Sequence, residues 1–97
     1  MDIALKIEHP KFAVAEVRNT IAYVLRTETE QVRLRRDYYA DVCASFEKEH
    51  NLSSDQFLIQ FEQGTMGDDL YTFDWFAAKR GLDLWEQRYQ ILRGVSL

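Results

Sequence analysis

The chain has 97 residues, of which 46% are hydrophobic and 29% charged; this composition excludes a disordered chain and allows one hydrophobic core. Twelve Lys and Arg against sixteen Asp and Glu give a net charge of -4, which disfavours a general nucleic-acid-binding surface. The single Cys43 and the lack of a signal pattern or a long apolar run predict a cytoplasmic protein without membrane association. Only four Gly and one Pro occur, so we expect long helices in a single, mainly α domain over residues 1–97.

The first expected element is a short β-strand at residues 2–8, in which Ile3, Leu5 and Ile7 alternate with Asp, Ala, Lys and Glu. An alternation with period two is typical of a half-buried strand. Pro10 follows and suits the first turn of a helix, so the sequence predicts a long helix over residues 11–49.

Apolar residues along that helix recur mostly at spacings of three, four and seven, which places them on one face. Asn51 is a suitable left-handed residue to end it.

A second, short helix is expected over residues 53–63. Ser53 and Gln56 fit a capping box, and Leu52 with Phe57 fits the hydrophobic contact that often accompanies one. A glycine at position 64 then predicts the end of this helix.

The third expected helix spans residues 69–93. Asp68 and Asp69 suit its positive end, and Gly94 suits its exit. Gly81 lies in its middle, where a glycine costs about 1 kcal/mol relative to alanine, so we expect another helix to approach closely there. Its apolar residues form one row and a second, looser group that comprises Phe73, Phe76, Ala77, Leu84 and Ile91. Such a broad apolar face predicts burial of this helix on two sides.

Short connections favour an antiparallel helical hairpin, with the third helix folded back on the first and the second helix at the turn. The third helix is too short to cover the start of the first, and a lone strand leaves its backbone groups unpaired. We therefore expect a homodimer whose interface contains Ile3, Leu5, Ile7, Phe12, Val14, Val17, Ile21, Val24 and Leu25. Two alternatives remain open at this stage: a foreign protein that pairs with the strand, and a hairpin in which residues 12–17 form a second strand.

Candidate chemistry is sparse. Glu47 and His50 have the E-x-x-H spacing of helical metal sites, but no second such pair exists, so we predict no metal and no cofactor. Cys43 has no histidine placed near it by the pattern and is expected to be a buried residue, not a nucleophile.

Four carboxylates on the first helix also fit the magnesium ligands of a helical nucleotide pyrophosphohydrolase: Glu28, Glu30, Asp37 and Asp41. Arginines at positions 26, 33, 35 and 36 are interleaved with them, which favours a solvated face of ion pairs. The pyrophosphohydrolase stays an alternative, and the leading expectation is a protein without catalytic residues.

A ribbon-helix-helix DNA-binding regulator is the main rival interpretation, because a strand precedes two helices if a separate helix starts at a Thr27 and Glu30 capping box. The polar face of the strand offers only Asp2, Ala4, Lys6 and Glu8, which is poor for reading bases. Nucleic-acid binding is therefore disfavoured.

One weak resemblance covers residues 45–93. The run from Asn51 to Phe57 is followed by Phe61, Gly64, Met66-Gly67-Asp68-Asp69, Phe73-Asp74-Trp75 and Ala77. This pattern resembles short helical prokaryotic proteins taken to be antitoxins of small toxin-antitoxin pairs. The resemblance carries no catalytic or ligand motif, and it implies a dimer-prone protein that neutralises a partner, such as a small basic toxin, by contact.

Overall fold

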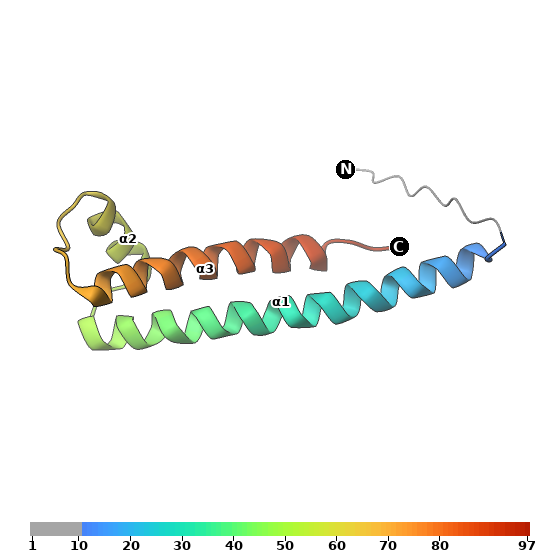
Figure 1. The fold of residues 1–97 in the computed structure, drawn as a ribbon, viewed down its shortest axis with the longest axis horizontal. Coiled ribbons are helices and arrows are strands. Elements are labelled where there is room, and N and C mark those ends of the chain that lie inside the picture. The colour runs from blue at the N-terminus through green and yellow to red at the C-terminus, as the bar shows by residue number, and fades with distance from the viewer. Residues whose placement is uncertain (1–10) are drawn as a thin grey trace.

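A computed structural model describes residues 11–97 and shows three helices in this order: α1 (Val14–His50), α2 (Ser54–Glu62) and α3 (Leu70–Arg93). Helices α1 and α3 run antiparallel side by side, and α2 packs at their closed end (Figure 1). The expectation of a mainly α protein is confirmed for the described residues. The expected strand at residues 2–8 lies outside them.

Helix α1 begins at Val14, three residues later than the sequence predicted. Ala13 has an extended backbone with φ -64° and ψ 146°, and its N–H donates to the Glu16 carboxylate at 3.3 Å. A carboxylate in the first turn stabilises a helix N-terminus, which explains the start at this point. The alternative of a strand over residues 12–17 is therefore wrong from Val14 onward. Asn51 ends the helix in the predicted left-handed conformation, with φ 50°.

Helix α2 begins as its capping signal predicted. The Ser53 hydroxyl accepts a hydrogen bond from the Gln56 N–H at 3.1 Å. After Glu62 the chain turns through Gly64, whose φ of 74° is costly for any side chain but glycine.

The start of α3 differs in detail from the prediction. Asp69 occupies the capping position, but its side chain makes no capping hydrogen bond. The Thr72 hydroxyl instead donates to the Asp69 carbonyl at 2.6 Å. Asp68 and Asp69 therefore stay exposed to solvent at the positive end of the helix.

The core lies at the closed end of the hairpin and is built around Trp75, which is fully buried. Its ring stacks on Phe57 of α2 at 4.0 Å between centroids and on Phe46 of α1 at 5.5 Å. Its indole N–H donates to the Ser54 hydroxyl at 2.9 Å, which satisfies the one polar group of this large side chain. One residue thus joins all three helices.

Hydrogen bonds and ion pairs between side chains also link the three helices. Arg36 of α1 donates to Glu86 of α3 at 2.8 Å. Lys79, only 8% exposed, pairs with Asp55 of α2 at 2.7 Å and with Asp83 at 2.8 Å. Burial acts to lower the pKa of Lys79, but the hydrogen bonds to these two carboxylates outweigh burial and raise it.

Candidate interaction surfaces

Helix α1 extends well past the end of α3. It has 37 residues against 24 in α3, so it is 13 residues, or about 20 Å, longer. We call residues 12–24 the overhang. Phe12, Val14 and Val24 are each more than half exposed there, and Figure 1 shows this part of α1 beyond the last turn of α3.

A shallow groove of about 280 Å³ follows one side of the overhang. Phe12, Val17 and Ile21 line it together with Glu16 and Thr20. All five residues come from α1 or from the turn before it, so no other element of residues 11–97 contributes to this groove. Five of the predicted interface residues, Phe12, Val14, Val17, Ile21 and Val24, thus lie on the overhang, and Ile3, Leu5 and Ile7 lie outside the described residues.

Leu25 is placed differently from the other predicted interface residues. It lines a second groove, of about 510 Å³, that also contains Leu92 of α3 and the tail residues Val95 and Leu97. The end of α3 and the tail therefore reach further along α1 than helix length alone predicted. Arg18, Arg26 and Arg93 also line this groove.

Three of the four carboxylates that fitted a magnesium site lie beside arginines, and Asp41 forms no ion pair among residues 11–97. Arg33 binds both Glu30 and Asp37, and Arg36 binds Asp37 at 2.8 Å. Arg35 lies 3.8 Å from Glu28. The geometry here is a row of ion pairs along α1, as the interleaved charges indicated.

Glu47 and His50 do not face a common ligand position. The Glu47 carboxylate accepts the Ser54 N–H at 2.7 Å. The His50 ring stacks on Tyr71 at 4.3 Å between centroids, and its buried Nε2 has no hydrogen-bond partner among the described residues. Within residues 11–97, no group of three or more His, Cys, Asp or Glu side chains is arranged to hold a metal ion.

Cys43 is 2% exposed in the core, and burial raises the pKa of its thiol. A raised pKa leaves less thiolate, the nucleophilic form, at neutral pH.

The separate helix that a ribbon-helix-helix arrangement requires at Thr27 is absent from the described chain. Thr27 lies inside α1, which is continuous from Val14 to His50. Two arginines of α1 that phosphate contacts would need, Arg33 and Arg36, are engaged by carboxylates.

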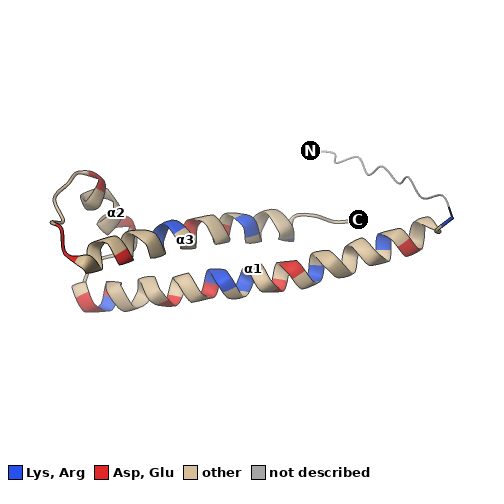
Figure 2. Ribbon diagram, viewed as in Figure 1, with Lys and Arg blue, Asp and Glu red and all other residues tan. Residues whose placement is uncertain are grey.

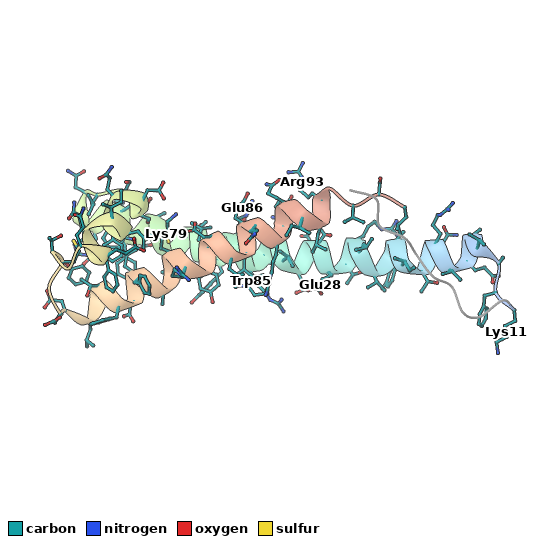
Figure 3. All side chains as sticks on the ribbon, turned by 90° about the horizontal axis from the view of Figure 1, so that it is seen from above. Lys11, Glu28, Lys79, Trp85, Glu86 and Arg93 are labelled. Carbon is teal, nitrogen blue, oxygen red and sulfur yellow. The ribbon has the colours of Figure 1, made fainter. Side chains whose placement is uncertain are left out.

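Arginines contact aromatic rings of α3 along both long edges of the hairpin, a feature that the sequence did not reveal. Figure 3 shows Trp85 and Glu28 on one edge and Glu86 and Arg93 on the other. The Trp85 ring lies between two guanidinium groups, those of Arg35 and Arg88, each 4.8 Å from the ring centroid. Cation–π contacts of this kind stabilise a partly exposed aromatic ring.

The outer face of α3 also carries exposed apolar side chains, of which Leu70 is the most exposed at 83%. Phe73, Leu84 and Ile91 follow along the helix and are all exposed. The looser apolar group in the sequence contained these last three residues, but the expectation of burial on two sides is not met for them within residues 11–97. Leu70 was not part of that group in the sequence. It lies three residues before Phe73, so the same helical spacing would have placed it on this face.

Comparison with protein-family models, curated proteins and solved structures found no match to this chain. No helix among residues 11–97 combines the length and the apolar character that crossing a bilayer requires. The function is therefore inferred from the overhang and from the exposed apolar side chains of α3.

Proposed function

We propose that this protein is a non-catalytic interaction module that acts as a homodimer through the α1 overhang and neutralises a partner protein by contact, in the manner of an antitoxin. The observation that carries the proposal is the length mismatch between α1 and α3. It leaves Val14 and Val24 of the continuous helix α1, and Phe12 just before it, more than half exposed.

The overhang supports a dimer on physical grounds. A lone helix in water gains little stability from its own hydrogen bonds and depends on the packing of an apolar face. Val17 and Ile21 line a groove that no other described element fills, and a second overhang of the same shape fits it in a two-fold arrangement. An isologous contact buries the same apolar residues on both copies at once.

The role as a neutralising partner protein is supported by the rest of the surface. Three of the four candidate magnesium-binding carboxylates lie beside arginines, and α3 exposes four large apolar side chains, Leu70, Phe73, Leu84 and Ile91. Exposed apolar patches on small proteins mark sites of protein contact. Purification of the tagged chain from its own cells, followed by mass spectrometry, tests this role: we expect one stoichiometric protein partner, and recovery of the chain alone would contradict the proposal.

Ile21→Asp tests the dimer. It places a carboxylate in the apolar contact, and we expect the mass in solution, measured by light scattering, to fall from two chains to one while the circular dichroism stays helical. Leu34→Asp is the matched control, because Leu34 lies on the same helix, is 49% exposed and lines a groove beside Trp85 of α3, outside the overhang. This variant should stay dimeric. A monomeric mass of the unmodified protein, or a dimer that survives Ile21→Asp, would overturn the proposed interface.

A further inference from the structure

The first turns of α3 present an unpartnered apolar face. Leu70, Phe73, Asp74 and Ala77 are all exposed and are spaced by three, four and seven residues, which places them on one side of the helix. The Phe73 ring lies edge-on against Phe61 of α2, with 6.1 Å between centroids. This contact holds Phe73 in place although half of its surface faces solvent, so the face is preformed.

Charge is distributed unevenly along the molecule, and this face lies in its acidic part. Residues 49–78 contain six Asp and Glu and no Lys or Arg, whereas the remaining residues contain ten Asp and Glu against twelve Lys and Arg. Figure 2 shows α2, the connection to α3 and the first turns of α3 without any blue segment. We call residues 49–78 the acidic end.

Most carboxylates of the acidic end are not neutralised within the described chain. Asp55 is paired with Lys79. The ion pairs found among residues 11–97 do not include Glu62, Asp68, Asp69 or Asp74. Asp68 and Asp69 directly precede Leu70, and Asp74 follows Phe73, so negative charge surrounds the exposed apolar side chains.

We propose that the face formed by Leu70, Phe73, Asp74 and Ala77 is the docking site for a basic, amphipathic segment of the partner protein. Apolar side chains of that segment cover Leu70 and Phe73, and its Lys or Arg side chains pair with the surrounding carboxylates. The inference rests on the proposed function as an interaction module and adds the chemistry of the partner. A two-fold contact of this face with the same face of a second copy is disfavoured, because it would bring two acidic ends together.

A synthetic helical peptide of leucine and lysine, with leucines on one face, is the probe. We expect it to shift amide signals of the protein in NMR spectra mainly within residues 58–78. Binding should weaken about tenfold or more between about 0.02 M and 0.3 M salt, because exposed charges are screened. A peptide of the same pattern with glutamate in place of lysine should bind at least about tenfold more weakly, since like charges repel.

Variants separate this face from the rest of α3. Leu70→Ser with Phe73→Ser should weaken peptide binding about tenfold or more, as expected when two central apolar contacts are lost. Asp68→Asn with Asp74→Asn, which leaves the apolar side chains in place, should reduce the salt dependence. Leu84→Ser with Ile91→Ser is the matched control, because both side chains are exposed apolar residues of α3 outside the acidic end, and binding should stay within about twofold.

Circular dichroism shows whether each variant is folded, and light scattering measures whether it is a monomer or a dimer. Equal losses in the control variant, equally tight binding of the glutamate peptide, or no binding of the lysine peptide by a folded protein would overturn this docking site. A dimer that fails to bind the lysine peptide contradicts the docking site alone. A monomer that binds it at residues 58–78 supports the docking site and contradicts the homodimer.

Discussion

Gly81 shows how a single residue sets the distance between the two long helices. A Cβ atom built there would lie 2.8 Å from Cε1 of Tyr39 on α1, closer than two carbon atoms can approach. The tyrosine ring therefore occupies the space that a side chain would need. The helical cost of glycine, about 1 kcal/mol, is offset by this close packing.

We expect Gly81→Ala to lower the free energy of unfolding by about 1–3 kcal/mol, since the overpacked ring costs more than the helix gains. Urea unfolding measures the change. Gly94→Ala is the control, because its Cβ would meet only carbonyl oxygens at 3.6 Å, and it should be close to neutral. Tyr39→Leu should remove most of the penalty in the double variant. If Gly81→Ala were as stable as the unmodified protein, the close approach of Tyr39 would be contradicted.

The sequence predicts best those residues whose structural role depends only on their neighbours in the chain. Asn51 and Ser53 act through their own backbone neighbours, and the structure confirms both. Gly81 was expected to meet another helix, and it meets Tyr39. The missing capping bond of Asp69 shows the limit: the sequence places a suitable residue at the start of α3, but it does not show whether the side chain turns toward the free N–H groups there.

At the scale of the element, α1 and α3 are joined by packing and by charge along one edge. Arg36 reaches Glu86 across the pair, and its guanidinium also lies 4.6 Å from the Tyr89 ring centroid. The apolar spacing predicted the order and the antiparallel pairing of the helices, because burial of one stripe per helix leaves few arrangements. It did not predict which arginines stack on aromatic rings, because a long side chain has several partners within reach and only the packed helices decide among them.

The Arg36–Glu86 pair should couple α1 to α3 in a pH-dependent way. The hydrogen bond from Gln90 and that from Arg36 lower the pKa of Glu86 below its ordinary value of 4.5. A lowered carboxyl pKa in the folded state gives stability that is present above pH 4.5 and is lost as the pH falls through the lowered value.

A double-mutant cycle of Arg36→Met and Glu86→Gln should therefore give a coupling of about 0.5–1 kcal/mol at neutral pH, a small value because both groups are partly exposed. Chemical unfolding at several pH values measures the coupling, which should disappear well below pH 4.5. The corresponding cycle of Arg36→Met with Gln87→Ala should be additive at every pH. A coupling that stays constant down to acid pH would show that the charge on Glu86 is not its source.

The whole molecule has two ends with different chemistry. The overhang at one end of α1 carries apolar side chains, and the acidic end at the other carries unneutralised carboxylates around Leu70 and Phe73. The principal axes measure 61 × 22 × 18 Å, so the two surfaces are far apart on an elongated body. Two copies joined at their overhangs would hold one partner site at each distal end.

The sequence predicted the first surface, the overhang, because the lengths of two helices can be compared from their start and end signals alone. The second depends on which face of α3 the core leaves exposed, and this follows only from the packing of α2 and α3.

The geometry of the dimer gives the last prediction. Val17, Ile21 and Val24 follow one another at spacings of four and three on the overhang, so in an antiparallel two-fold contact the central Ile21 lies nearest to its own copy. Two cysteines at such a position come within the reach of a disulfide, which needs Cα atoms closer than about 7 Å. We therefore expect Ile21→Cys to form a covalent dimer under mild oxidation, visible on a non-reducing gel.

Native Cys43 should not contribute to this cross-link, because it is buried and the pKa of its thiol is raised. Ala44→Cys is the matched control: it adds an equally new thiol at an exposed position of α1 near the α2 end, away from the overhang, and it should stay monomeric on the same gel. A dimer in solution whose Ile21→Cys variant fails to cross-link, while Ala44→Cys does, would move the interface away from the overhang to the other end of α1.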